Sequence, residues 1–161
     1  MANRWGVVVG LAAVGAVAVG AQSRPQATVA AAAVTSPVAP GAEARLALKV
    51  TLPPNVHVQA NKTSDPFFIP TLLTVEPPSG FTVQEILYPR SERLKQEGLA
   101  EPLLVFGNQF TITVRLKAAP SIGPGDVTVP GRLRYQACDA TTCYPPARAD
   151  ATWTLRVAAR K

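Results

Sequence analysis

The sequence predicts an all-β protein built as an antiparallel β-sandwich, and three observations support this fold class. The chain has 161 residues, enough for one domain with a single hydrophobic core. Its 16 prolines argue against a helical bundle, because proline removes a backbone donor and disrupts a helix interior. Apolar side chains also recur at every second position in several segments, which is the pattern of strands with one buried face.

The clearest alternation lies in residues 45–52, and residues 110–116 and 152–157 repeat it. Trp153 in the last of these segments is predicted to lie in the core. Shorter predicted strands cover residues 56–60, 71–76, 81–88 and 127–135. About seven or eight short strands, with turns roughly every ten residues, indicate an immunoglobulin-like antiparallel β-sandwich. Residues 91–102 are charged and are predicted to form a long loop or one helical turn.

The N-terminus has the three parts of a secretory signal peptide, predicted for residues 1–21. Arg4 supplies the positive charge, residues 6–20 form an apolar stretch of 15 residues, and small side chains then suit cleavage before Gln22. Because a membrane span needs about 20 apolar residues, we expect export without stable membrane insertion. The protein is therefore predicted to be periplasmic or otherwise exported, in a compartment where disulfides form.

The stretch after the signal peptide is predicted to be a flexible linker, over residues 22–43. Alanine and interspersed prolines dominate it, and no alternation of apolar and polar side chains is visible. The folded domain is then expected to span residues 44–161.

The inventory of side chains excludes most classes of enzyme. His57 is the single histidine, the 10 acidic residues are scattered, and no glycine-rich phosphate loop is present. Two cysteines and one histidine fall short of a zinc site, and Cu(I) would lack its usual thioether ligand because the one methionine is the initiator. Acidic residues interrupt the densest basic group, at residues 90–95. We expect no cofactor, no metal and no nucleic-acid partner.

Cys138 and Cys143 are the remaining candidates for chemistry. Cys138 continues the predicted strand 127–135, and the four residues 139–142 suit a hairpin loop. Cysteines that flank such a loop would be cross-strand neighbours within disulfide range. A bond that closes about six residues contributes only about 2 kcal/mol by the chain-entropy relation. The short loop favours a redox role, but the residues alone leave both a redox disulfide and a structural staple open.

Residues 135–146, Tyr-Gln-Ala-Cys-x4-Cys-x-Pro-Pro, resemble the active-site hairpin of the N-terminal periplasmic domain of the thiol:disulfide interchange protein DsbD. Residues 54–61 with 69–71 resemble an early strand pair of that family, and residues 105–116 resemble its central strand. The resemblance covers about residues 42–158.

This resemblance implies an immunoglobulin-like domain with one redox-active cysteine pair. Such a domain takes electrons from a thioredoxin-like protein or a membrane electron-carrier domain and passes them to exported proteins that bear disulfides. Cys143 would exchange mixed disulfides with these partners, and Cys138 would resolve them. Because the chain ends at Lys161 without a multi-span domain or a thioredoxin domain, we expect that it takes electrons from a separate protein or no longer carries them.

Two features depart from the family pattern. Four residues separate the cysteines, whereas the best-known members have five. In those members an aromatic side chain on a cap loop shields the pair, but the matching residues 91–102 contain no aromatic residue. Leu94 or Leu99 would have to substitute for it.

The residues around the pair carry their own expectations. Asp139 is predicted to form an Asx turn, although its charge could also disfavour a neighbouring thiolate. Tyr144 either packs over the disulfide or is a core or edge aromatic, and Pro145 and Pro146 end the strand pairing. His57 is predicted to be an exposed strand histidine that approaches the cysteines only if the resemblance extends to it.

Two hypotheses for function follow. The leading one is an exported thiol-disulfide oxidoreductase of the protein-disulfide reductase type, with Cys138 and Cys143 as its catalytic residues. The alternative is a non-enzymatic immunoglobulin-like binding module whose hairpin disulfide is structural. The redox state and exposure of the cysteine pair distinguish the two.

Overall fold

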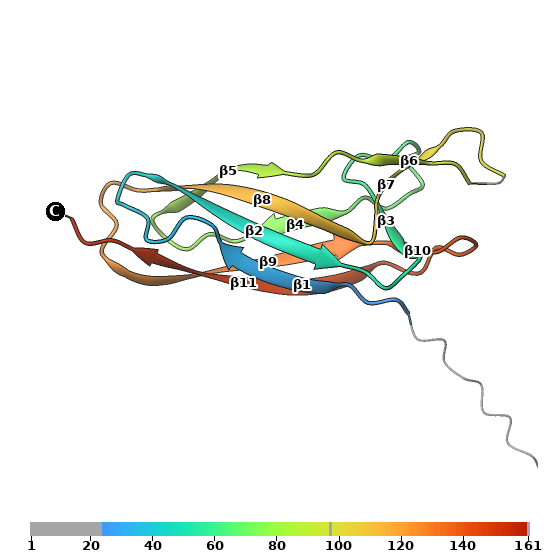
Figure 1. Cartoon of the computed structure of the whole chain (residues 1–161). Helices are drawn as coiled ribbons and strands as arrows, with labels where there is room; N and C mark the ends of the chain where they lie inside the picture. The colour runs from blue at the N-terminus through green and yellow to red at the C-terminus, as the bar shows by residue number, and fades with distance from the viewer. Residues whose placement is uncertain (1–23, 97, 161) are drawn as a thin grey trace, which may run out of the picture.

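The computed structural model describes residues 24–96 and 98–160, and within them the chain forms strands, turns and loops without a helix (Figure 1). Its strands are, in chain order, β1 (Thr28–Ala33), β2 (Glu43–Thr51), β3 (His57–Gln59), β4 (Leu72–Val75), β5 (Phe81–Leu87), β6 (Glu92–Leu94), β7 (Leu103–Phe106), β8 (Gln109–Ala118), β9 (Gly125–Tyr135), β10 (Ala137–Cys138) and β11 (Ala147–Val157). They form three sheets, with the orders β1-β2-β8-β5, β11-β9-β4 and β10-β3-β7-β6.

The sheets β1-β2-β8-β5 and β11-β9-β4 pack against each other as a sandwich. Burial alternates along β2, β8 and β11, as the sequence pattern predicted. The buried side chains of both sheets join in one hydrophobic cluster. Neighbouring strands pair antiparallel, for example β2 with β8 and β9 with β11. The all-β antiparallel sandwich is therefore confirmed.

Trp153 lies at the centre of this sandwich, as predicted, with 1% of its surface exposed. Its indole N–H donates a hydrogen bond to the carbonyl of Ala47 in the opposite sheet, at 2.8 Å. The ring lies so close to Gly131 that a Cβ there would stand 2.7 Å from its Cζ3 atom and 3.1 Å from the carbonyl oxygen of Thr74. Glycine at this position lets the indole fill the space between the sheets.

The prediction of a flexible linker at residues 22–43 is wrong, because β1 lies within it. β1 pairs with β2 along its whole length, and the N–H of Ala27 just before it donates to the hydroxyl of Tyr135 at 2.8 Å. Alanine has a low strand propensity and gives no alternation, but pairing with an edge satisfies its backbone groups. The folded part therefore begins before residue 44. The predicted signal peptide, residues 1–21, lies outside the described residues.

The third sheet, β10-β3-β7-β6, consists of short strands at one end of the sandwich and is called the small sheet below (Figure 1). β6 lies within residues 91–102, where a loop or a helical turn was predicted, and pairs with β7. That prediction is wrong for these three residues of β6. β6 therefore brings residues 94–96 to the same end of the molecule as the cysteines.

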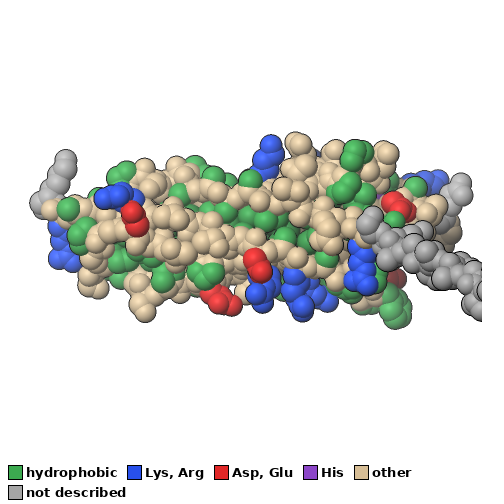
Figure 2. Space-filling model, turned by 90° about the horizontal axis from the view of Figure 1, so that it is seen from below, with side chains coloured by type: hydrophobic (Ala, Val, Ile, Leu, Met, Phe, Trp, Pro, Cys, Tyr) green, Lys and Arg blue, Asp and Glu red, His purple; other side chains and the backbone are tan. Residues whose placement is uncertain are grey.

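Charged side chains occupy several separate places on the surface. Figure 2 shows acidic side chains beside some of the basic ones on the face that it presents. Arg115 joins three strands, since its guanidinium lies 3.0 Å from the carboxylates of both Glu43 and Glu85. Within the described part of the chain, no helix has the length and apolarity to cross a membrane.

Candidate functional site

Cys138 lies in the small sheet and not in a continuation of β9. The chain leaves β9 after Tyr135, and β10 then pairs with β3, so the predicted continuous strand breaks at Gln136. The Gln136 side chain occupies this corner. Its amide donates to the carbonyl of Tyr144 at 3.2 Å and accepts from the N–H of Ile69 at 3.3 Å. These side-chain bonds replace backbone pairing at the point where the chain changes sheets.

Cys138 and Cys143 form a disulfide across a tight hairpin, with an S–S distance of 2.04 Å and a Cα–Cα distance of 4.1 Å. The N–H of Asp139 donates to the carbonyl of Thr142, and the N–H of Tyr144 donates to that of Ala137, each at 2.9 Å. The cysteines therefore occupy a non-hydrogen-bonded antiparallel pair, where side chains approach most closely. The predicted hairpin loop at residues 139–142 is confirmed.

The two cysteines differ in their exposure to solvent. Cys138 is fully buried, whereas Cys143 is exposed at the end of the hairpin. A thiolate on another protein can attack a disulfide only at a sulfur that it can reach. The arrangement therefore offers Cys143 to a partner and keeps Cys138 behind it.

Asp139 organises the loop between the cysteines. Its Oδ1 accepts the backbone N–H groups of Thr141 at 2.9 Å and Thr142 at 2.8 Å, which confirms the predicted Asx turn. Its Oδ2 accepts the hydroxyl of Tyr144 at 2.8 Å. The bonds from Thr141, Tyr144 and Thr142 lower the pKa of this carboxyl to about 2. The same carboxylate raises the pKa of Tyr144, whose hydroxyl is thus tied to the hairpin.

His57 is buried beside the disulfide, so the prediction of an exposed strand histidine is wrong. It is 9% exposed and stands directly opposite Cys138 in the β3–β10 register. Burial lowers the pKa of its imidazole, and the charge of Asp139 opposes this effect. All three residues of β3 are buried. The chain returns to this strand at Thr71, whose hydroxyl donates to the carbonyl of Gln59 at 2.6 Å.

Gln59 also lies at the site, although the sequence alone did not predict it. This side chain is fully buried, and its Nε2 lies 3.8 Å from the sulfur of Cys138, in a donating position. Gln59 follows His57 by two residues in a predicted strand, and residues i and i+2 share one face, so the sequence placed the two side chains together. This spacing points to the site only when β3 is known to lie beside the cysteines.

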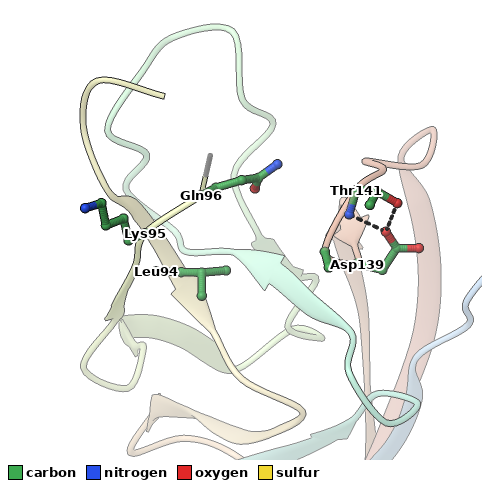
Figure 3. Close-up of a pocket in the computed structure, with 6 residues that line it drawn as sticks. Leu94, Lys95, Gln96, Asp139 and Thr141 are labelled. Atoms are coloured by element: carbon green, nitrogen blue, oxygen red, sulfur yellow. Dashed lines mark hydrogen bonds between the residues drawn. The ribbon is translucent and has the colours of Figure 1, made fainter. Parts of the chain in front are cut away.

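A groove of about 500 Å³ separates the hairpin loop from the segment that follows β6. It is lined on one side by Leu94, Lys95 and Gln96, and on the other by Asp139, Ala140 and Thr141 (Figure 3). Figure 3 shows the side chains of Leu94 and Gln96 directed toward the hairpin and that of Lys95 directed away.

Of the two leucines expected to shield the cysteines, Leu94 stands across this groove from the loop. Leu99 instead is 40% exposed and lines another hollow with Phe68. In the described residues no group of three or more histidine, cysteine, aspartate or glutamate side chains could hold a metal ion.

Comparisons with known proteins support the resemblance inferred from the cysteine motif. Residues 22–154 match the family described as thiol:disulfide interchange protein DsbD, N-terminal. No curated protein sequence matches. Among solved structures, the DsbD N-terminal domain of Neisseria meningitidis in the reduced form aligns with 15% identity and a TM-score of 0.46, over 81% of this chain and 90% of that one.

A second structure, the N-terminal periplasmic domain of ScsB from Proteus mirabilis, aligns with 14% identity and a TM-score of 0.51. The alignment covers 81% of this chain and 45% of the ScsB chain, so this protein spans less than half of that relative. At this identity the likeness shows the fold alone. Together with the family match and the two packed sheets, it confirms the predicted immunoglobulin-like fold.

Proposed function

Because this chain belongs to the family of thiol:disulfide interchange protein DsbD N-terminal domains, we propose that it passes electrons between proteins through Cys138 and Cys143. The observation that carries the proposal is the asymmetry of the disulfide. Cys143 is exposed at the end of a hairpin, whereas Cys138 is fully buried and its sulfur contacts the amide of Gln59. A structural staple needs no such difference, whereas an exchange reaction requires one accessible sulfur and one protected resolving sulfur.

The exchange runs in two halves. A thiolate of a reducing partner attacks the sulfur of Cys143, the Cys138–Cys143 bond breaks, and Cys138 leaves with the electron pair. A second partner thiol then resolves the mixed disulfide, which leaves the domain reduced. In the other half, the Cys143 thiolate attacks a disulfide of the substrate protein, and Cys138 attacks Cys143 to release the reduced substrate.

The proposed partners are a thioredoxin-like protein or a membrane electron-carrier domain as the electron donor, and exported disulfide-bearing proteins as acceptors. The proposed location is the periplasm or another extracytoplasmic space, reached by means of the signal peptide of residues 1–21. The apolar stretch at residues 6–20 and the family match support this location.

The reduction potential of the cysteine pair tests the proposal. The mature domain is equilibrated in glutathione buffers and its free thiols are counted. A value between about −180 and −270 mV is expected, because working oxidoreductases lie in that range. A value below about −300 mV would mark a structural disulfide, and the non-enzymatic binding module with a hairpin staple would then be the better description.

Trapping of mixed disulfides tests the roles of the two cysteines. A thioredoxin-like partner that lacks its own resolving cysteine is first charged with thionitrobenzoate on its remaining cysteine, which supplies the disulfide to be attacked. The Cys143 thiol of a Cys138→Ala variant is expected to displace the thionitrobenzoate and accumulate the mixed disulfide, since Cys143 remains reachable. A Cys143→Ala variant is expected to form almost none, because Cys138 is buried. Equal trapping by both variants would show that the roles are assigned wrongly.

A further inference from the structure

Two buried polar atoms lie beside the cysteine pair without a hydrogen-bond partner among the described residues. They are Nε2 of His57 and Oε1 of Gln59. Buried polar atoms in folded proteins are almost always paired, because an unpaired one keeps its cost of desolvation. Two such atoms on neighbouring same-face positions of one short strand point to a role that appears when the disulfide changes state.

The register places both side chains on the face of the sheet that carries the side chain of Cys138. His57 is its direct cross-strand partner, and such partners share one face with Cβ atoms about 4.5–5.5 Å apart. Gln59 follows on the same face, and its Nε2 lies 3.8 Å from the sulfur. Cys138 is fully buried but stands apart from the hydrophobic cluster of the sandwich. On this face of β3 the sulfur therefore has a contact with Gln59, and His57 is its cross-strand partner.

We propose that His57 accepts the proton of the Cys138 thiol when this sulfur closes the disulfide, and that Gln59 donates a hydrogen bond to the same sulfur as it becomes a thiolate. The inference rests on the proposed exchange function and adds the residues that make its buried sulfur reactive. A thiol is a poor nucleophile until it loses its proton, and burial in apolar surroundings makes that loss harder.

In the step that closes the disulfide, the S–H bond of Cys138 breaks and its proton passes to Nε2 of His57. This nitrogen carries a free lone pair in the neutral tautomer protonated at Nδ1. The Cys138 sulfur forms a bond to Cys143, and the bond from Cys143 to the partner sulfur breaks. The partner leaves as a thiolate with the electron pair, and His57 returns its proton to solvent. The pair is oxidised and the partner is reduced.

The charges around His57 suit an imidazole that is neutral at rest and carries a proton briefly. Burial lowers its pKa, so it is free to accept a proton near neutral pH. Asp139 on the hairpin is the charge that favours the protonated form. The register of β3 with β7, which pairs Val58 with Phe106, brings Gly107 toward the His57 position, and the carboxylate of Glu92 lies against this glycine, with its Oε1 3.6 Å from where a Cβ would stand.

A two-phase reaction with dithiobis(nitrobenzoate), an aromatic disulfide whose released thiol is coloured, tests this proposal on the reduced domain. The first equivalent of thiol reports attack by Cys143, and the second reports closure by Cys138. The proposed function and this inference therefore fail separately. A domain without a fast first phase lacks a reactive Cys143, whereas a defect confined to the second phase concerns Cys138 alone.

The decisive variant is His57→Gln, which keeps a polar side chain but cannot take up a proton. We expect its second phase to be about a hundredfold slower near neutral pH, the lower range of what a positioned base contributes, with an unchanged first phase. The wild-type second phase should be nearly independent of pH between about 6.5 and 8, above the lowered pKa of His57 and below that of a free thiol. In the variant it should rise about tenfold per pH unit.

Controls separate proton transfer from loss of packing. Val58→Ala removes a buried side chain from the opposite face of the same strand and should leave the second phase and its pH dependence unchanged in the folded domain. Gln59→Leu removes the donor at similar volume and should slow the second phase about tenfold without changing its pH dependence. A His57→Gln second phase within about twofold of wild type, with the same pH dependence, would overturn the proposal.

Discussion

The long sandwich and the small sheet at its cysteine end are built differently. β8, β9 and β11 have 10, 11 and 11 residues, and their buried positions alternate with exposed ones. β10, β3, β7 and β6 have 2, 3, 4 and 3 residues, and β3 is buried on both faces. The sandwich buries apolar side chains almost alone, whereas the small sheet buries a histidine, a glutamine and a sulfur together.

From this difference we expect the sandwich to supply most of the stability and the small sheet to hold the side chains of the proposed reaction. Long ladders with a continuous apolar face supply most of the free energy of folding. The short strands hold the side chains of the proposed exchange reaction, and they tolerate unpaired polar atoms because the sandwich holds the chain together. Substitutions in the sandwich should therefore change the free energy of unfolding, and substitutions at the cysteine end should change reactivity first.

The largest expected effect is that of Trp153→Ala in the sandwich. It removes the largest fully buried side chain and its hydrogen bond to Ala47, and it should lower the free energy of unfolding by about 4 kcal/mol. Urea denaturation measures this loss, and Thr154→Ala on the exposed face of the same strand serves as the control with an expected change below about 0.5 kcal/mol. A loss below about 1 kcal/mol for Trp153→Ala would contradict the central role of this side chain.

The second-largest expected effect is that of Gly131→Ala, which should lower the free energy of unfolding by as much as about 3 kcal/mol. The added Cβ would meet the indole of Trp153 at 2.7 Å and the backbone carbonyl of Thr74 at 3.1 Å, so one of them must move. Gly123→Ala is the matched control, because nothing lies within 4 Å of the Cβ that it adds. Equal stability of the two variants in urea would show that the sandwich has room at Gly131.

Reduction of the disulfide should have a smaller effect on stability. It opens a loop of about six residues, for which the chain-entropy relation gives about 2 kcal/mol. Urea denaturation of the same protein with and without reductant measures the difference. If the reduced domain loses as much as the Trp153→Ala variant, the small sheet would be essential for folding, and the division between the two regions would be wrong.

The same division explains how much could be predicted from the sequence. The long strands, the core position of Trp153 and the hairpin at residues 139–142 followed from alternation and turn chemistry, which are local signals. β1 was not predicted because alanines in an edge strand show no alternation of apolar and polar side chains. β6 was not predicted because its three residues form a strand only by pairing with β7.

The surroundings of the cysteines could not be predicted from local sequence patterns. The break at Gln136 moves Cys138 into a second sheet, and the strand pattern of residues 127–135 gives no sign of this break. His57 and Gln59 are buried in a strand whose neighbours come from distant parts of the chain, such as β10 and Thr71. The family resemblance indicated which cysteines matter, whereas only the fold shows which polar side chains they contact.

The smallest expected effect concerns the charge of Asp139. Hydrogen bonds from Thr141, Tyr144 and Thr142 in the hairpin lower the pKa of its carboxyl from 3.8 to about 2, so the unfolded chain binds a proton more readily than the folded one. The stabilisation that this carboxylate supplies is complete above about pH 4 and is lost as the pH falls toward 2. The Asp139→Asn variant removes the charge but keeps an oxygen for Thr141 and Thr142. Its stability should therefore fall less than that of the wild type over this interval.

Urea denaturation of wild type and Asp139→Asn at a series of pH values tests this expectation. Asp150→Asn, an exposed change of the same charge on β11, is the control for effects of net charge. Because the bonds of Asp139 all lie within the hairpin, weakening them by removal of the charge should loosen the loop around Cys143 before it affects the sandwich. Faster reaction of Cys143 in the reduced Asp139→Asn domain, with little change in unfolding at neutral pH, would place the carboxylate's effect in the small sheet. A large change in unfolding at neutral pH would place it in the sandwich instead.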